Sequence, residues 1–339
     1  MKRRHFLASS AAAASSLALP AVAQPRSTVK FVPQADLAAI DPVFASALVT
    51  RTHGFLVFDQ LYGWDDNFQP QPQMVEGHVI EDDGRKWTIT LREGLKFHDG
   101  TPVLARDAVA SINRWSQSDA LGQGLRAVTD ELKAVSDRVF QFRLKKPYPM
   151  LPLALGKPSL FCPVMPERLA STPPNVQVTE MVGSGPFRFI AGERVAGSLA
   201  VYEKFTGYVP RSGGTPSFAA GPKIAYVDRV EWHTIPDAAT AAAALQTGEV
   251  DWWEQPQPDL LPLLKRRKDI RVEAKERGGL MGMIRFNCLQ PPFNNPAMRR
   301  AFLAGVNQTD YMQAVMGGDK SLWNDRCGFF LPGSPNASE

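Results

Sequence analysis

The segment from Trp87 to Asp107 constrains the fold of this chain more than any other. Apolar and polar residues alternate from Trp87 to Leu91, which is the period of a strand with one buried face. A second short strand is predicted at Leu95–Phe97, and Asp99-Gly100 supplies a turn. A helix follows, because the next apolar residues recur at helical spacing: Ala105, Ala108, Val109, Ile112 and Trp115. The segment therefore predicts strand, turn, strand and helix in this order.

The size and composition of the chain are those of a soluble globular protein. Its 339 residues are enough for two domains or one large one. Hydrophobic residues make up 44% and charged residues 21%, which is an ordinary balance. Beyond the N-terminus, no apolar run approaches the length needed to span a bilayer.

The N-terminus has the pattern of a cleavable secretory signal peptide. Three basic residues from Lys2 to Arg4 precede an Ala/Ser/Leu stretch, which ends in Ala21-Val22-Ala23, a small-x-small cleavage pattern. The pair Arg3-Arg4 and the weakly apolar core favour twin-arginine export, with an ordinary Sec signal as the alternative. We therefore expect a periplasmic protein. Because no cysteine lies at the cleavage point, we expect it to be free rather than lipid-anchored.

The remaining charge and the cysteines argue against nucleic acid, metal and cofactor as partners. Removing residues 1–23 changes the balance of 38 Lys+Arg and 34 Asp+Glu to 35 and 34, so the mature chain is nearly neutral. It carries no basic stripe for nucleic acid. The three cysteines, Cys162, Cys288 and Cys327, form no CxxC pair, and any two of them could form at most one disulfide. No metal and no cofactor is expected.

Further segments predict elements along the chain. Met181–Phe189 contains two glycines and a proline that impose a turn before a strand. Asp237 is a plausible N-cap for an alanine-rich helix that ends before Gly248. Asn295 caps another helix, in which Met298, Phe302 and Val306 share a face. The other predicted elements are strands at Thr28–Val32, Phe140–Leu144 and Val227–Ile235, helices at Thr52–Leu61 and Thr309–Gly317, and a surface loop at Arg211–Gly221.

These segments resemble extracytoplasmic solute-binding protein family 5, the dipeptide-, oligopeptide- and nickel-binding proteins of ABC importers. The family's LR-x-G-x-x-F-x-D-G-x-P hairpin corresponds to residues 91–102, its D-x-x-t…G-e-x-D element to residues 237–251, and its fN-x-x-x-pPF element to residues 286–293. One departure is Ala108, which precedes Val109 where the family usually joins Asp directly to Val. The resemblance extends from about Thr28 to Gly318.

The resemblance implies an α/β, two-lobed fold like that of periplasmic binding proteins, of the large type, with a discontinuous first lobe and an incomplete second lobe. The expected domains are a signal peptide at 1–23, the main sheet subdomain of the first lobe at 24–70 and 180–277, its smaller subdomain at 71–179, and the start of a truncated second lobe at 278–339. Family members continue well beyond this point, so we expect a truncated product or a fragment of a longer gene. In peptide-binding relatives, the aspartate that pairs with the ligand's free amine lies in the later part of the second lobe. No residue here is assigned to that role.

The implied function is the capture of a short peptide, or a related small solute, and its delivery to an ABC permease in the inner membrane. We expect a monomer and no bond-breaking step. Within the family, the alternatives are a nickel chelate, an opine, a sugar or haem as ligand. Outside it, the alternatives are a secreted α/β hydrolase and a non-functional truncated remnant.

Enzyme and metal chemistry find little support in the sequence. No G-x-S-x-G nucleophile elbow and no GK[ST] phosphate loop occurs. His53, His78 and His233 have no second histidine at ligand spacing. His98-Asp99 is better interpreted as part of a turn than as a catalytic or metal pair, because strand neighbours point to opposite faces.

The most suggestive cluster for ligand binding is Trp252-Trp253-Glu254, which follows the Gly248–Asp251 turn where relatives approach the cleft between lobes. Two aromatics and a carboxylate suit a peptide backbone or a cationic ligand. Because strand neighbours alternate faces, only one tryptophan is expected to reach ligand, while the other packs. Weaker candidates are Phe44 in the early loop, and Phe286 and Asn287 at the lobe crossover, which equally suit packing or structural hydrogen bonding.

Overall fold

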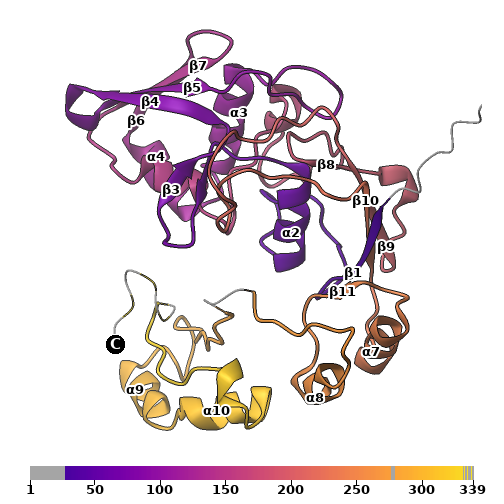
Figure 1. Cartoon of the computed structure of the whole chain (residues 1–339). Coiled ribbons are helices and arrows are strands. Elements are labelled where there is room, and N and C mark those ends of the chain that lie inside the picture. Colours follow the sequence, from indigo (N-terminus) through magenta and orange to yellow (C-terminus); the bar gives the residue numbers. More distant parts are fainter. Residues whose placement is uncertain (1–26, 276–278, 331, 333, 335–336, 338–339) are drawn as a thin grey trace, which may run out of the picture.

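The computed structural model describes residues 27–275 and 279–330, together with residues 332, 334 and 337. The predicted signal peptide at residues 1–23 lies outside the described residues. The sheets and most helices form one large body, and α9 (Pro296–Ala304) and α10 (Gln308–Met316) lie below it in Figure 1. In the part of the chain that is described, no helix has the length and apolar character to cross a membrane.

A five-stranded sheet brings together segments that are far apart in the sequence. Its spatial order is β11 (Trp252–Trp253), β1 (Thr28–Val32), β10 (Arg229–His233), β9 (Leu199–Lys204) and β8 (Phe187–Phe189). Strand β1 runs parallel to both of its neighbours, whereas the other two pairs are antiparallel. The first predicted strand is confirmed at Thr28–Val32, and the strand predicted at Val227–Ile235 is shorter at both ends.

Helix α2 (Leu48–Val57) packs on one face of this sheet, within a core that contains Phe31, Tyr202 and Trp232. The predicted helix at Thr52–Leu61 thus begins earlier and ends earlier. It ends at Val57 because the Val57 carbonyl accepts a hydrogen bond from the Gly185 N–H at 2.9 Å, and Phe58 is extended. The end of the helix is therefore set by a hydrogen bond to a segment that is distant in the sequence, and no local sequence pattern predicts it.

Helix α7 (Ala238–Thr247) begins and ends as predicted. The Asp237 side chain accepts the Thr240 N–H, and Gly248 ends the helix with φ 74°. Ala241 and Ala244 of α7 form a small buried cluster with Val32 and Val250.

A second, antiparallel sheet has the order β4 (Val75–Glu81), β5 (Lys86–Leu91), β7 (Val139–Leu144) and β6 (Thr129–Ala134). The strand–helix part of the Trp87–Asp107 prediction is confirmed. The apolar residues of β5 are buried, and α3 (Ala105–Trp115) buries its predicted face in the same core, apart from the half-buried Val109. Two short strands form a separate pair, β2 (Tyr62–Trp64) with β3 (Pro70–Pro72). The remaining α-helices are α4 (Ala120–Val128), α5 (Leu151–Gly156), α6 (Glu167–Ala170) and α8 (Leu261–Lys265). Short 3₁₀ turns lie at Asp82–Gly84, Ala191–Glu193, Pro258–Leu260 and Lys320–Leu322.

The strand predicted at Leu95–Phe97 does not form. Lys96 makes only an isolated bridge with Pro102. The reason is local: the Phe97 N–H already bonds the Thr101 carbonyl around a tight turn at Gly100, which has φ 86°, and proline has no N–H to extend the pairing. The turn predicted at Asp99-Gly100 is present.

The strands of the five-stranded sheet fall within residues 24–70 and 180–277, and those of the four-stranded sheet within 71–179. The pair β2–β3 crosses the boundary at residue 70. The division into subdomains stays a prediction.

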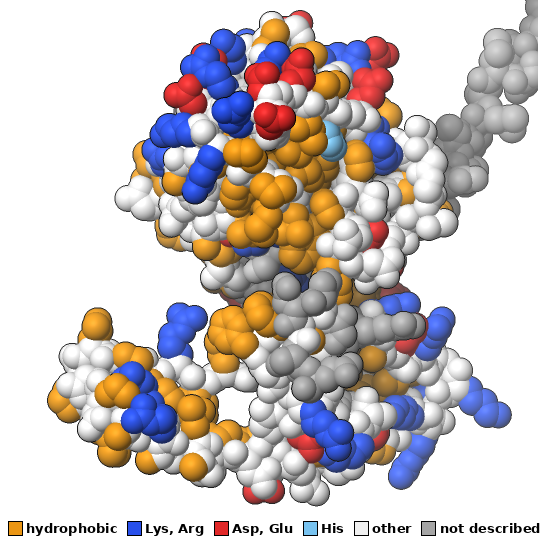
Figure 2. Space-filling model, turned by 90° about the vertical axis from the view of Figure 1, so that its left-hand side faces the viewer, with side chains coloured by type: hydrophobic (Ala, Val, Ile, Leu, Met, Phe, Trp, Pro, Cys, Tyr) orange, Lys and Arg blue, Asp and Glu red, His pale blue; other side chains and the backbone are white. Residues whose placement is uncertain are grey.

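The C-terminal segment packs mainly on itself. Phe286 stacks on Phe293 with ring centroids 4.5 Å apart, and its edge meets Phe302 at 5.0 Å. Asn295 caps α9 as predicted, but Val306 follows the end of the helix and does not extend its face. None of the residues in α9 and α10 is buried. Figure 2 shows hydrophobic side chains on this lower part, and a larger gathering in the middle of one face of the large body.

Candidate functional site

Strand β11 presents one tryptophan to solvent and packs the other. The Trp252 side chain is 56% exposed and meets the Phe31 ring edge-on, with centroids 4.9 Å apart. Trp253 is half-buried against the cluster of Val32, Ala241, Ala244 and Val250. The alternation of strand side chains thus leaves Trp252 as the tryptophan available to a ligand at this edge of the sheet.

Glu254 follows β11 and lies close to a cation from α2. Its Oε2 accepts the Gln34 N–H at 2.9 Å, while its own N–H bonds the Val32 carbonyl at 3.0 Å. Burial raises the pKa of the Glu254 carboxyl, and the nearby Arg51 guanidinium partly opposes this shift. Among the described residues, the Arg51 side chain makes no hydrogen bond or ion pair of its own. Two opposite charges therefore lie near each other beside the strand that carries Trp252.

Phe44 lies in the loop between β1 and α2. Its side chain is 46% exposed, and its N–H bonds Asp41 Oδ1 at 3.4 Å. Asp41 is fully buried and also accepts the Val43 N–H at 3.0 Å, so a buried carboxylate fixes the backbone of this turn. The position leaves the Phe44 ring open to solvent.

A cavity of about 370 Å³ opens along α2, and we name it the α2 cavity. One wall is the half-buried face of the helix, formed by Arg51, Thr52 and Phe55. The opposite walls come from Pro158, Pro186, Phe187 and the segment 218–225. Arg51 thus belongs to the cavity lining and also acts electrostatically on Glu254, the residue that follows β11.

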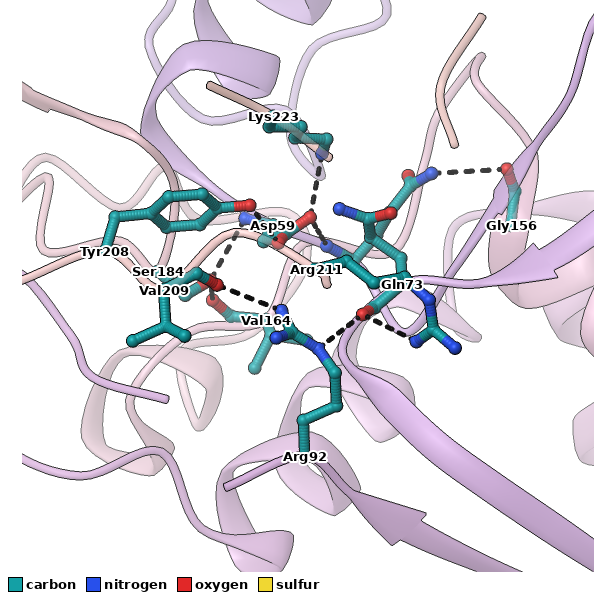
Figure 3. Close-up of polar contacts among 11 residues, drawn as sticks. Asp59, Gln73, Arg92, Gly156, Val164, Ser184, Tyr208, Val209, Arg211 and Lys223 are labelled. Carbon is teal, nitrogen blue, oxygen red and sulfur yellow. Dashed lines mark hydrogen bonds and ion pairs between the residues drawn. The ribbon is translucent and has the colours of Figure 1, made fainter. Parts of the chain in front are cut away.

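The loop that forms the far wall is anchored to a buried carboxylate (Figure 3). Asp59 is fully buried; its Oδ1 accepts from Lys223 Nζ at 2.7 Å, and its Oδ2 accepts the Tyr208 hydroxyl at 2.8 Å. Burial raises the pKa of Tyr208 well above its usual value, so the hydroxyl keeps its proton and donates it to Asp59. Tyr208 and Lys223 flank the loop predicted at Arg211–Gly221, and both of its ends are thus tied to Asp59, which lies two residues after the end of α2.

Two arginines tie the same loop to the four-stranded sheet. Arg92 donates to the Gln73 carbonyl at 2.8 Å and to the Val209 carbonyl at 3.1 Å. Arg211 donates to the Val75 carbonyl at 2.8 Å. The anchor around Asp59 and the α2 cavity were not predicted. The only local signal for them was the Ser/Gly/Pro-rich composition of the loop.

His98 and Asp99 serve separate structural roles. His98 is buried; its Nδ1 accepts the Gly183 N–H at 3.2 Å, and its Nε2 lies 3.1 Å from the Gly185 carbonyl. Asp99 Oδ1 accepts the Thr101 N–H at 3.0 Å on the other side of the turn. Within the described ranges, no group of three His, Cys, Asp or Glu side chains is arranged to hold a metal ion.

Phe286 and Asn287 lie in the C-terminal segment. Phe286 packs against Phe293 and Phe302, and Asn287 Oδ1 accepts the Leu289 N–H at 3.1 Å. These contacts assign both residues local structural roles. A part in ligand binding remains a prediction for them, as it does for Phe44, Trp252, Trp253 and Glu254.

The fold is that of the two-lobed periplasmic binding proteins. The periplasmic binding protein DppA from Helicobacter pylori, solved in complex with the peptide STSA, matches with a TM-score of 0.67 and 23% identity, over 86% of this chain and 59% of that one. Residues 69–336 match the model of the bacterial extracellular solute-binding proteins, family 5 Middle. The chain belongs to this family.

Two curated relatives place the chain more closely within the family. The probable peptide ABC transporter periplasmic-binding protein y4tO of Sinorhizobium fredii is 39% identical over 324 residues, which are 94% of this chain and 60% of the relative. The glutathione-binding protein GsiB of Pectobacterium atrosepticum is 28% identical over 284 residues, 83% of this chain and 52% of the relative. The chain thus spans between half and two thirds of the length of these relatives.

Proposed function

We propose that this protein is the periplasmic substrate-binding component of an ABC importer, which captures short peptides and delivers them to a permease in the inner membrane. Family membership supports this class of function, and the name of the Sinorhizobium relative supports peptide as the ligand. The name of the Pectobacterium relative and the peptide bound to the Helicobacter protein point to the same kind of ligand.

The observation that carries the proposal is the α2 cavity together with the edge of the five-stranded sheet at β11. Arg51 lines the cavity, and β11 with the residue that follows it presents an exposed indole (Trp252) and a carboxylate (Glu254) on which the Arg51 charge acts. A short peptide carries an ammonium, a carboxylate and apolar side chains, and such a wall offers a complement to each of them. In a two-lobed protein, the second wall closes over the ligand by hinge motion, and ligand contacts made only in the closed state stabilise it.

Export is the second part of the proposal. The N-terminal pattern supports cleavage after Ala23 and release into the periplasm. Mass spectrometry of the periplasmic protein should show Gln24 as its first residue. If export follows the twin-arginine route, Arg3→Lys combined with Arg4→Lys should retain the precursor in the cytoplasm, whereas a Sec substrate would still be exported.

Ligand binding is tested by tryptophan fluorescence and thermal shift. The exported chain and the longest in-frame product of its gene are both titrated with di- to pentapeptides, nickel–histidine, opines and sugars. We expect a saturable response to peptides in at least the longer product, and a rise in melting temperature with ligand concentration. A clear response to another class, with none to any peptide, would refute peptide as the ligand.

A further inference from the structure

The α2 cavity combines an apolar lining with one uncommitted cation. Phe55, Phe187 and Phe218 contribute rings, and Pro158 and Pro186 add apolar surface. Two cations also belong to the lining, but they differ in their commitments. Lys223 is bound to Asp59 at 2.7 Å and lies 5.7 Å from the centre of the Phe55 ring. Arg51 makes no such bond among the described residues, so its guanidinium is available to a ligand.

We propose that the α2 cavity binds the C-terminal residue of a peptide, with its apolar side chain against the rings and its free carboxylate on Arg51. This inference rests on the proposed function, because it names the part of the ligand that this wall of the site would take. A guanidinium binds a carboxylate through two parallel hydrogen bonds, which a lysine ammonium cannot do. The volume of about 370 Å³ is at the lower end of the ~300–1,000 Å³ range of ligand pockets, which suits one residue rather than a long peptide.

The position of Glu254 gives the site a direction. Glu254 follows Trp252 and Trp253 of β11 and is fixed there by its bonds to Val32 and Gln34, so its carboxylate repels a second carboxylate at this edge of the sheet and attracts an ammonium. The carboxylate of the ligand is therefore favoured on the cavity side of Arg51, with the rest of the peptide extending toward Trp252.

The conformation of Phe218 also supports a binding role. Its backbone has φ 47°, which costs a residue with a bulky side chain on the order of 1 kcal/mol or more. Its side chain is nevertheless 50% exposed, so packing in a core does not explain the strain. The loop is held in place by the bonds of Tyr208 and Lys223 to Asp59 and by the Ala219 N–H, which bonds the Trp64 carbonyl at 2.9 Å. The fold thus maintains a strained turn that keeps an aromatic ring at the cavity.

The direct test uses small probes on the exported chain. Isothermal titration calorimetry compares N-acetyl-L-phenylalanine with its C-terminal amide and with N-acetylglycine. We expect the acid to bind about tenfold more tightly than the amide, because a charge-assisted pair with Arg51 is lost in the amide. N-acetylglycine should bind more weakly than the acid, because it lacks the side chain. Equal affinities for the acid and the amide, or no binding of the acid, would overturn the proposal.

Two variants test the carboxylate contact with Arg51 and the apolar contact with Phe218 separately. Arg51→Gln should reduce the ratio of acid to amide affinity from about tenfold to about one while leaving binding of the amide unchanged. Phe218→Ala should weaken both probes and keep their ratio. Arg126→Gln is the matched control, because Arg126 is an exposed arginine on α4 outside the cavity lining, and it should bind as the wild type does. If Arg51→Gln keeps the preference for the acid, the carboxylate is bound elsewhere.

A third comparison distinguishes this inference from the proposed function. The dipeptide Ala-Phe and its C-terminal amide are titrated into the same proteins. If both bind equally, peptide capture stands and the carboxylate site fails. If neither binds while N-acetyl-L-phenylalanine does so through Arg51, the site stands and peptide capture by this chain fails.

Discussion

Arg114 and Asp41 form a two-point ion pair that is closed to solvent. Arg114 Nη1 lies 3.1 Å from Asp41 Oδ1 and Nη2 lies 2.6 Å from Oδ2, and the two side chains are 1% and 0% exposed. Arg114 belongs to α3, against the four-stranded sheet, whereas Asp41 belongs to the loop that joins the five-stranded sheet to α2. Further bonds to backbone groups satisfy both side chains, including the Val178 N–H to Asp41 at 2.9 Å and Arg114 to the Thr172 carbonyl at 2.9 Å. The pair connects the two sheet systems through their interior.

Breaking this pair should be costly. Arg114→Met leaves the Asp41 carboxylate buried without its cation, and we expect the free energy of unfolding to fall by about 3–5 kcal/mol. Urea unfolding at pH 7 measures the loss. Arg106→Met is the control on the same helix, because Arg106 is exposed and its nearest carboxylate, Glu167, lies 3.7 Å away; it should change stability by less than about 1 kcal/mol. Equal losses in the two variants would contradict the role assigned to the buried pair.

The stability of the protein should fall at mildly acidic pH because of His98. Burial lowers the pKa of His98 from 6.5 to about 4. Between these values the unfolded chain binds a proton that the folded protein does not, so stability falls as the pH decreases from about 6.5 to about 4. His98→Gln should remove this part of the dependence, on the order of 3 kcal/mol. Urea unfolding of both proteins at several pH values tests it, and parallel curves would show that His98 does not contribute. Burial also lowers the pKa of His53, to about 3, but that group is common to both proteins.

Gly183 should tolerate no side chain. A Cβ there would lie 1.9 Å from the Val57 carbonyl oxygen, which ends α2, so the backbone itself would have to move. We expect Gly183→Ala to lower the free energy of unfolding by several kcal/mol, on the order of 3, or to prevent folding. At Gly192 no atom lies within 4 Å of a built Cβ, and Gly192→Ala should be within about 0.5 kcal/mol of the wild type. Comparable stabilities of the two variants, measured by thermal unfolding, would be the opposing result.

The two adjacent tryptophans should separate binding from stability. Trp252→Ala should weaken peptide binding by about tenfold and leave stability nearly unchanged, because its side chain is 56% exposed. Trp253→Ala should have the reverse effect, with about 2 kcal/mol of stability lost, because it packs against Val32 and α7. Fluorescence titration and urea unfolding of both variants provide the two measurements. A binding defect in Trp253→Ala alone would assign the ligand contact to the other face of the strand.

Local pattern was sufficient for elements whose evidence lies within a few residues. The period-two run in β5, the apolar stripe of α3, and the Asp237 and Asn295 caps each depend on contacts between sequence neighbours, and each is present. Prediction was wrong at α2 because a distant segment decided the outcome: the helix ends at Val57, whose carbonyl accepts a hydrogen bond from the Gly185 N–H. It was also wrong at Leu95–Phe97, for a local reason, because the tight turn that follows leaves this segment a single bridge.

For the candidate site, too, the sequence predicted some features, whereas others depended on the tertiary structure. The strand period predicted that only one of Trp252 and Trp253 reaches ligand; Trp252 is the more exposed of the two, and its contact with a ligand stays a prediction. Phe286 and Asn287 illustrate the limit, because their neighbours in the C-terminal segment determine their contacts.

The sequence by itself determined the family and the α/β character, because each depends on the order and period of neighbouring residues. Only the tertiary structure decided the α2 cavity and the anchor on Asp59. Lys223 and Asp59 are 164 positions apart, and the charge of Arg51 acts on Glu254 across 203 positions because β11 pairs with β1. The physical reason is that ion pairs and cavities depend on distances in space, which the chain sets only when its two sheets assemble.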